Sequence, residues 1–243
     1  MPHGRNQMAA MADDLVSRGL AVWNLEYRRL GTFRAGWPAT MDDVAAGIDH
    51  LPQLSVGGVD LDLDRVIVVG HSAGGHLALW VGGRNRPRSP QSPRVSVAAA
   101  VGLAPIADLA YAYEAKVGVE VVAELLGGTP SQYPERFRAA SPMEMLPLCV
   151  RQLILHGTAD DVVPIECSRR YSRAAKTAGD TVEFVELSGA GHMEYLDTSS
   201  EAYAILCRWL LAFMSEPGLR AGAAEQPLPL DEGAPPESRR PGR

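Results

Sequence analysis

The sequence "RVIVVGHSAGGHLALW", from Arg65 to Trp80, decides the fold of this protein. It opens with apolar, mostly β-branched residues, which are typical of a strand buried on both faces of a parallel sheet. After Gly-His-Ser-Ala-Gly-Gly, the pattern becomes that of a helix. A serine between glycines contributes little to a core, so the turn from strand to helix indicates a functional position for Ser72.

Further strands and helices alternate along the rest of the chain. Strands are expected over Leu20–Tyr27, Val95–Ala104, Arg151–Gly157 and Thr181–Gly189. Helices are expected over Met8–Ser17, Thr40–Leu54 (with Thr40 as N-cap), Ser72–Gly82, Glu166–Ala178 and Ser199–Met214, with shorter pieces around Leu109–Leu126 and Pro134–Ala140. This alternation predicts an α/β fold, a mostly parallel sheet with helices on both faces. In such sheets the chemistry lies at the carboxyl ends of the strands, where Ser72 falls.

The length fits one α/β domain. The chain has 243 residues, 46% of them apolar, which is enough for a sizeable core. We expect this domain over residues 1–215, with a small cap-like insertion at about 105–148. Residues 216–243 are rich in Pro, Gly and charge, and are expected to form a disordered C-terminal tail.

Composition and charge limit the kinds of partner that this protein is expected to bind. The net charge is −6 and no basic stripe occurs, so no nucleic-acid partner is expected. No apolar run approaches the roughly 18–20 residues of a membrane span, and no membrane partner is expected. The three cysteines, Cys149, Cys167 and Cys207, are odd in number and far apart, which predicts a reducing, cytoplasmic location. No histidine pair has metal-ligand spacing, so no metal site is expected, and the oligomeric state stays open.

Residues Gly70–Gly74 read GHSAG, the G-x-S-x-G pattern of a nucleophile elbow. We expect Gly70 and Gly74 to be required because a Cβ at either position would collide with the neighbouring strand or helix. Ser72 Oγ would then project above the sheet. The Ala73 N–H would lie at a helix N-terminus, where unpaired donors favour an oxyanion. The structural alternative is a glycine-rich turn with a helix-capping serine.

A serine nucleophile needs a base and a carboxylate that orients the base. In this fold class they follow in the order Ser, Asp or Glu, then His, each after a strand. The stretch "LILHGTADDVVP" supplies Asp160 and Asp161, and "VEFVELSGAGHMEY" supplies His192. Order and spacing therefore predict Ser72 and His192 as catalytic residues, while both carboxylates fit the position of the acid.

Longer stretches resemble a known family. "EYRRLG", "WPATMDDVAAGIDHL", "VVGHSAGGHLALW", "ILHGTADDVVPIECSRRY" and "GAGHMEYLD" are similar to the α/β-hydrolase superfamily, especially its esterase, arylformamidase and feruloyl-esterase-like branch. The resemblance covers most of the chain from about Leu15 to Leu211. It implies a serine hydrolase that cleaves a small ester or amide through an acyl-enzyme and requires no cofactor.

The resemblance also implies roles for particular residues. The family's acid motif H-G-x-x-D-x-x-V-P falls on His156 to Pro164, which selects Asp160 rather than Asp161. It further implies that Arg28 and Asp43 pair to brace a loop and that Trp37–Pro38 is a packed anchor. Tyr111, Tyr113 and Met143 are conceivable pocket residues, although a core or surface role is favoured for each.

One part of the family pattern is absent. Such enzymes usually have strands before the first helix, ending in an H-G-G-x segment that supplies a second oxyanion donor. This sequence opens on the helix, so we expect an N-terminally truncated sheet in which Leu20–Tyr27 and Val66–Val69 lose a shared neighbour. Loss of one oxyanion donor typically costs about 10²–10³-fold in turnover. A misassigned start codon or a truncation is our hypothesis for this late start.

The leading function is a serine carboxylester hydrolase acting on a small soluble ester, with an aryl-formamide as a variant. One alternative is a peptidase of the prolyl-oligopeptidase type, because the acid and histidine loops resemble that branch too. The other alternative is an inactive truncated fragment that acts at most as a binding module.

Overall fold

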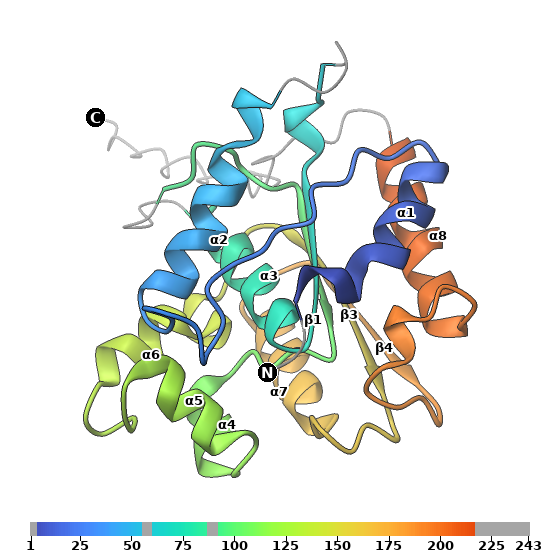
Figure 1. Ribbon diagram of the computed structural model, residues 1–243. Helices are drawn as coiled ribbons and strands as arrows, with labels where there is room; N and C mark the ends of the chain where they lie inside the picture. Colours follow the sequence, from blue (N-terminus) through green and yellow to red (C-terminus); the bar gives the residue numbers. More distant parts are fainter. Residues whose placement is uncertain (1–3, 55–59, 87–91, 217–243) are drawn as a thin grey trace, which may run out of the picture.

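The computed structural model describes residues 4–54, 60–86 and 92–216. Four parallel strands form one sheet in the order β1-β2-β3-β4 (Figure 1). They are β1 Ile67–His71, β2 Ala99–Leu103, β3 Arg151–Gly157 and β4 Val182–Leu187. The expected parallel α/β sheet is confirmed. Beyond Glu216 the predicted tail lies outside the described residues.

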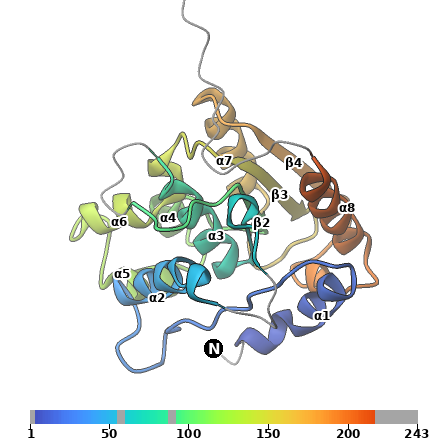
Figure 2. The same cartoon turned by 90° about the horizontal axis from the view of Figure 1, so that it is seen from above.

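Helices pack on both faces of the sheet, as Figures 1 and 2 show. One face is covered by α1 (Ala9–Ser17) and α8 (Glu201–Ser215), and the other by α2 (Ala39–Asp49), α3 (Ala73–Gly83) and α7 (Glu166–Thr177). Side chains of β3 alternate between two cores, with Leu153 and Leu155 on the α1/α8 side and Ile154 on the other. Because both faces are covered, β3 is buried along almost its whole length.

The segment predicted as a cap-like insertion forms three short helices. They are α4 (Leu109–Glu114), α5 (Val119–Leu126) and α6 (Pro134–Ala140), drawn in green in Figure 1. The 3-10 turns of the chain are Arg5–Met8, Leu51–Gln53, Leu63–Arg65, Pro142–Met145 and Glu194–Leu196. Trp37 anchors its loop to this region, because its N–H donates to Leu125 O at 2.7 Å and its side chain packs against the core. That the insertion acts as a cap stays a prediction.

The strand predicted over Leu20–Tyr27 is wrong: this segment has no regular secondary structure. A strand needs a hydrogen-bonded neighbour, and the described residues place β1 at the edge of the sheet. Side chains hold the segment instead. Leu25 packs against Gly47 of α2, where a Cβ would approach Leu25 Cδ2 to 2.7 Å. Leu25 and Tyr27 pack against the core, whereas Val22 and Trp23 are 37% and 48% exposed, so the apolar run marks a partly packed segment rather than a paired strand.

Thr40 is not the N-cap of α2, because the helix begins at Ala39 and Pro38 holds the cap position. The Thr40 hydroxyl donates instead to Arg28 O at 2.7 Å, outside the helix, so it fixes the preceding loop. Arg28 also forms a two-pronged ion pair with Asp43, with Nε–Oδ2 at 2.8 Å and Nη2–Oδ1 at 2.7 Å. The predicted Arg28–Asp43 brace is present.

Candidate active site

Ser72 lies between β1 and α3 in a backbone conformation that side chains rarely adopt, with φ 55° and ψ −116°. Such a conformation costs roughly 1–3 kcal/mol and persists only where the surroundings enforce it. Here the Ser72 N–H donates to Leu103 O at 2.8 Å, and Ser72 O accepts from His76 N at 3.0 Å. These two bonds fix the turn on the carboxyl edge of the sheet.

Gly70 and Gly75, rather than Gly70 and Gly74, are the glycines that the turn requires. A Cβ on Gly70 would lie 2.0 Å from Gly74 O, which no side chain tolerates. A Cβ on Gly75 would lie 3.0 Å from Gly70 O and 3.3 Å from Leu103 O. A Cβ on Gly74 meets nothing within 4 Å, so the predicted steric need for Gly74 is wrong. The close approach in the turn is between Gly70 and the carbonyl of Gly74, and the Cα of Gly74 faces open space.

Ala73 begins α3 and is exposed. Among the described residues its N–H has no hydrogen-bond acceptor, as expected for the first residue of a helix. This donor adjoins Ser72 and points along a helix dipole that favours negative charge. The position can therefore stabilise an oxyanion formed at Ser72.

Asp160 and His192 follow β3 and β4, and their side chains meet. Asp160 Oδ2 accepts a hydrogen bond from His192 Nδ1 at 2.7 Å, with exposed side-chain fractions of 0% and 8%. A carboxylate only accepts, so Nδ1 carries a proton, and in the neutral form of the ring Nε2 then keeps its lone pair. His192 thus has its Nε2 available to take a proton.

Two backbone donors and a second histidine surround the Asp160 carboxylate. Oδ1 accepts from the N–H groups of Val162 and Val163 at 2.9 and 2.8 Å, and His156 Nε2 lies 3.3 Å from Oδ2. Burial disfavours the charge, but the hydrogen bonds from His192, Val163 and Val162 outweigh it and lower the Asp160 pKa. Asp160 therefore remains an anion beside His192. The neighbouring Asp161 is exposed and takes no part.

The acid and histidine loops are held against each other by backbone contacts. The Ala159 N–H donates to Ala190 O at 3.0 Å, and the Gly189 N–H donates to Thr158 Oγ1 at 2.9 Å. Gly157 makes this approach possible, because a Cβ there would lie 2.1 Å from Ala190 O. The glycine of the H-G-x-x-D motif thus lets the two loops close together.

His156 supports the acid loop. Its Nε2 bonds Val163 O at 2.8 Å and its Nδ1 bonds Ser168 Oγ at 2.7 Å. Burial lowers the pKa of His156. A neutral His156 therefore ties α7 to the acid turn.

His71 connects the turn at Ser72 to the histidine loop, and no sequence motif selects this residue. This residue adjoins Ser72, and its ring centroid lies 4.6 Å from that of His192. Its Nε2 lies 2.7 Å from His192 O. Ser72 Oγ itself makes no hydrogen bond to His192 within the described ranges, and such bonds are often loose before substrate binds.

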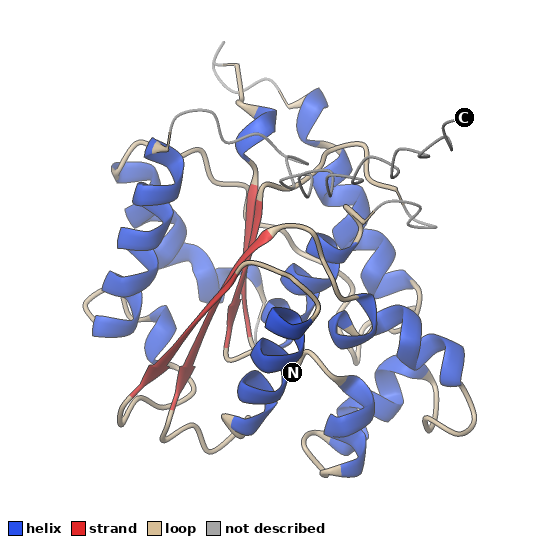
Figure 3. Cartoon of the chain, turned by 180° about the vertical axis from the view of Figure 1, so that it is seen from behind, coloured by secondary structure: helices blue, strands red, loops and turns tan. Residues whose placement is uncertain are grey.

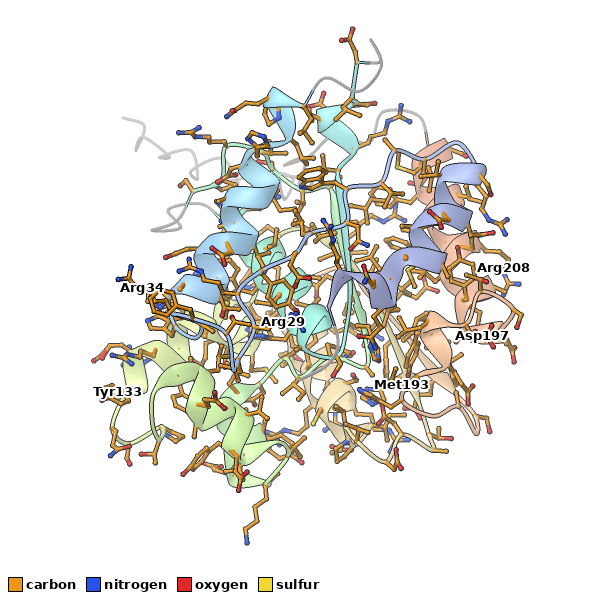
Figure 4. The ribbon with its side chains drawn as sticks, in the orientation of Figure 1. Arg29, Arg34, Tyr133, Met193, Asp197 and Arg208 are labelled. Carbon is orange, nitrogen blue, oxygen red and sulfur yellow. The ribbon has the colours of Figure 1, made fainter. Side chains whose placement is uncertain are left out.

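The other candidate residues lie apart from this cluster. Met143 lines a shallow hollow with Leu146 and residues of α7, and Tyr111 packs beneath the Arg170 guanidinium. Tyr113 packs edge-on against Phe137. Figure 4 labels Met193, next to His192, at the lower end of the sheet, and this side chain is 50% exposed. The rim of the site therefore carries an apolar side chain that was not predicted.

Among the described residues, no group of three or more His, Cys, Asp or Glu is arranged to hold a metal ion. In the same part of the chain, no helix is both long and apolar enough to cross a membrane.

The site has the features of an α/β-hydrolase. These are a parallel sheet, a strained serine between β1 and α3, and an acid–histidine pair at the same carboxyl end of the sheet. Figure 3 shows the arrows of the strands pointing towards the same end of the sheet. The BD-FAE family model matches residues 3–174, well over half of the chain, so the chain belongs to the BD-FAE family.

Two curated relatives come from Mycobacterium tuberculosis. The chain is 30% identical to Esterase LipC over 210 residues and 28% identical to Esterase LipQ over 196 residues. These matches cover 81% and 77% of the chain, and 51% and 46% of the relatives. The chain thus spans about half the length of the curated relatives it matches.

Solved structures show the same fold. Thermogutta terrifontis esterase 2, phosphoramylated by tabun, has 25% identity and a TM-score of 0.68, covering 89% of this chain and 79% of that one. A truncated carbohydrate esterase from gut microbiota has 22% identity and a TM-score of 0.65, covering 79% and 74%. The second likeness is one of fold alone.

Proposed function

We propose that this protein is a serine hydrolase that cleaves a small carboxylic ester through an acyl-enzyme. The observation that carries the proposal is the 2.7 Å bond between His192 Nδ1 and Asp160 Oδ2 at the sheet edge where Ser72 ends its strand. The names of LipC, LipQ and esterase 2 support an ester rather than a peptide as the substrate.

The first chemical step is acylation. His192 Nε2 takes the proton of Ser72 Oγ while this oxygen attacks the ester carbonyl, and the carbonyl oxygen becomes an oxyanion. The Ala73 N–H donates to that oxyanion, and Asp160 stabilises the imidazolium that forms. When the carbon–oxygen bond of the ester breaks, the alkoxide takes the proton from His192 and leaves as the alcohol.

Deacylation repeats the sequence with water. His192 removes a proton from a water molecule, whose oxygen attacks the acyl carbon of the Ser72 ester. The intermediate collapses, Ser72 takes back its proton, and the carboxylic acid leaves. Every proton in the cycle moves through Nε2 of one imidazole, which is why its tautomer has to be fixed.

The test is hydrolysis of nitrophenyl acetate by the wild-type protein and by Ser72→Ala, beside a peptide nitroanilide. We expect turnover of the ester by the wild type, a loss of at least about 10³-fold in Ser72→Ala, and little cleavage of the anilide. Equal ester rates in the two proteins would contradict the proposal, and faster cleavage of the anilide would favour a peptidase. The predicted cytoplasmic location stays a prediction.

A further inference from the structure

We infer that His71, the residue before the nucleophile, is a positioning residue that locks the main chain of His192 to the end of β1. The inference rests on the proposed hydrolase function for its kinetic consequence, but the contact itself can be tested without activity. His71 does not touch the reacting atoms in the mechanism above, so it acts through His192.

The contact has a defined direction. His71 Nε2 lies 2.7 Å from His192 O, across 121 residues of sequence. A backbone carbonyl can only accept, so Nε2 carries the proton and donates it. The His192 carbonyl therefore fixes the tautomer of the His71 ring, and the same bond ties the histidine loop to His71.

Two rings of the histidine loop enclose this bond. The His71 centroid lies 4.6 Å from that of His192 and 5.6 Å from that of Tyr195. Tyr195 is fully buried, and its hydroxyl accepts from the Gly157 N–H at 2.6 Å. His71 thus packs into a corner built from the histidine loop and the end of β3, where it cannot easily turn.

The His71 ring is neutral when it does this. Burial, and after it the adjacent His192, lowers the pKa of His71 to about 4. A neutral neighbour does not repel the positive charge that His192 acquires during acylation. An imidazole here can therefore donate a hydrogen bond without placing a second cation beside the base.

Asp160 and His71 hold different parts of His192. Asp160 fixes the side chain through Nδ1, and His71 fixes the main chain through the carbonyl. Only the second anchor comes from the strand that carries Ser72. Without it His192 keeps its tautomer, but its distance from Ser72 is no longer set. A misplacement of about 1 Å can cost roughly 10²-fold in rate.

Two variants with the same amide group, His71→Gln and His71→Asn, test whether the reach of the hydrogen-bond donor matters. In His71→Gln the amide nitrogen reaches about as far as Nε2, whereas in His71→Asn it is one methylene too short. His76→Asn is the matched control, since buried His76 also bonds a backbone carbonyl through Nε2, that of Ala140 at 2.8 Å, away from the histidine loop.

The first readout is hydrogen–deuterium exchange of the peptide spanning residues 188–196, with thermal unfolding recorded alongside. We expect faster exchange in His71→Asn, wild-type exchange in His71→Gln, and unchanged exchange of this peptide in His76→Asn despite a lower Tm. The second readout is nitrophenyl acetate kinetics, in which we expect kcat to fall roughly 10–100-fold in His71→Asn, with KM within about three-fold. His71→Gln should restore most of kcat.

Equal behaviour of His71→Asn and His71→Gln, or unchanged exchange in both, would overturn the inference. If His71→Asn does not fold, His71→Leu, which fills the space without a donor, takes its place in both readouts. If Ser72→Ala hydrolyses the ester as fast as the wild type, the proposed function fails, and the exchange comparison still decides whether His71 holds the loop.

Discussion

Asp160 is surrounded by donors, and this arrangement decides what a substitution there does. Its two oxygens accept from Val162 N, Val163 N and His192 Nδ1. An asparagine has the same size but presents an NH₂ group to at least one of these donors. It therefore favours the tautomer of His192 in which Nε2 carries the proton and cannot act as a base.

We predict that Asp160→Asn lowers kcat for nitrophenyl acetate by at least roughly 10³-fold. The matched control is Asp161→Asn, since Asp161 is the exposed neighbour, and its kcat should stay within about two-fold of the wild type. Comparable losses in the two variants would show that the acid loop tolerates neither change for structural reasons and would remove the special role of Asp160.

The role of Ser72 as nucleophile stays a prediction, but its turn and the Asp160–His192 pair could be predicted because each residue follows an apolar strand within a recognisable motif. His71 could not, because its partner is a backbone carbonyl, which leaves no trace in the side-chain pattern. Gly74 was wrongly given a steric role for a similar reason: the collision at Gly70 involves the main chain of residue 74. The chemical role of a side chain can be predicted from a sequence motif, whereas a contact with the main chain depends on the fold.

Strands β1 to β4 could be predicted from their apolar runs, and their order explains why the motifs converge. The same kind of pattern at Leu20–Tyr27 did not give a strand, because pairing depends on a neighbour and not on the segment alone. Leu25 and Tyr27 still pack against the core, but Val22 and Trp23 are exposed. The apolar pattern therefore predicted only part of the packing there and not the absence of a hydrogen-bonded neighbour.

The end of β3 and the histidine loop touch at Gly157, and this contact gives a second prediction. In Gly157→Ala the new Cβ would lie 2.1 Å from Ala190 O, so the loop has to move away from Asp160. We expect roughly a 10-fold or larger loss of kcat. In Gly191→Ala, within the same loop, the nearest atom would be Glu194 Oε1 at 3.8 Å, and kcat should stay within about three-fold.

Steady-state kinetics with nitrophenyl acetate measure both glycine variants, and circular dichroism reports whether they fold. Wild-type kcat in Gly157→Ala would contradict the close approach of the two loops. A larger loss in Gly191→Ala than in Gly157→Ala would contradict the steric argument.

The molecule as a whole carries buried neutral histidines, and they link its stability to pH. Burial lowers the pKa of both His71 and His76 to about 4, and also lowers that of His156. Between about pH 6.5 and pH 4 the unfolded chain binds protons that these rings do not. The free energy of unfolding therefore falls as the pH is lowered through this window and is at its full value above it.

We predict that urea unfolding gives a free energy at pH 5 lower than that at pH 7 by on the order of 2 kcal/mol or more. In His76→Asn, which lacks one of the buried rings, the difference between the two pH values should be smaller. Identical free energies at pH 5 and pH 7 in the wild type would mean that the rings are already protonated in the fold or reach water.

Covalent labelling of Ser72 by an organophosphate is the most direct measurement of the central claim, that Asp160 and His192 activate this serine. After exposure to paraoxon, mass spectrometry should find the phosphoryl group on the peptide containing Ser72, and none on that peptide in Ser72→Ala. His192→Ala should react at least roughly 10³-fold more slowly. Labelling of another residue, or equal labelling rates in the wild type and His192→Ala, would contradict the account.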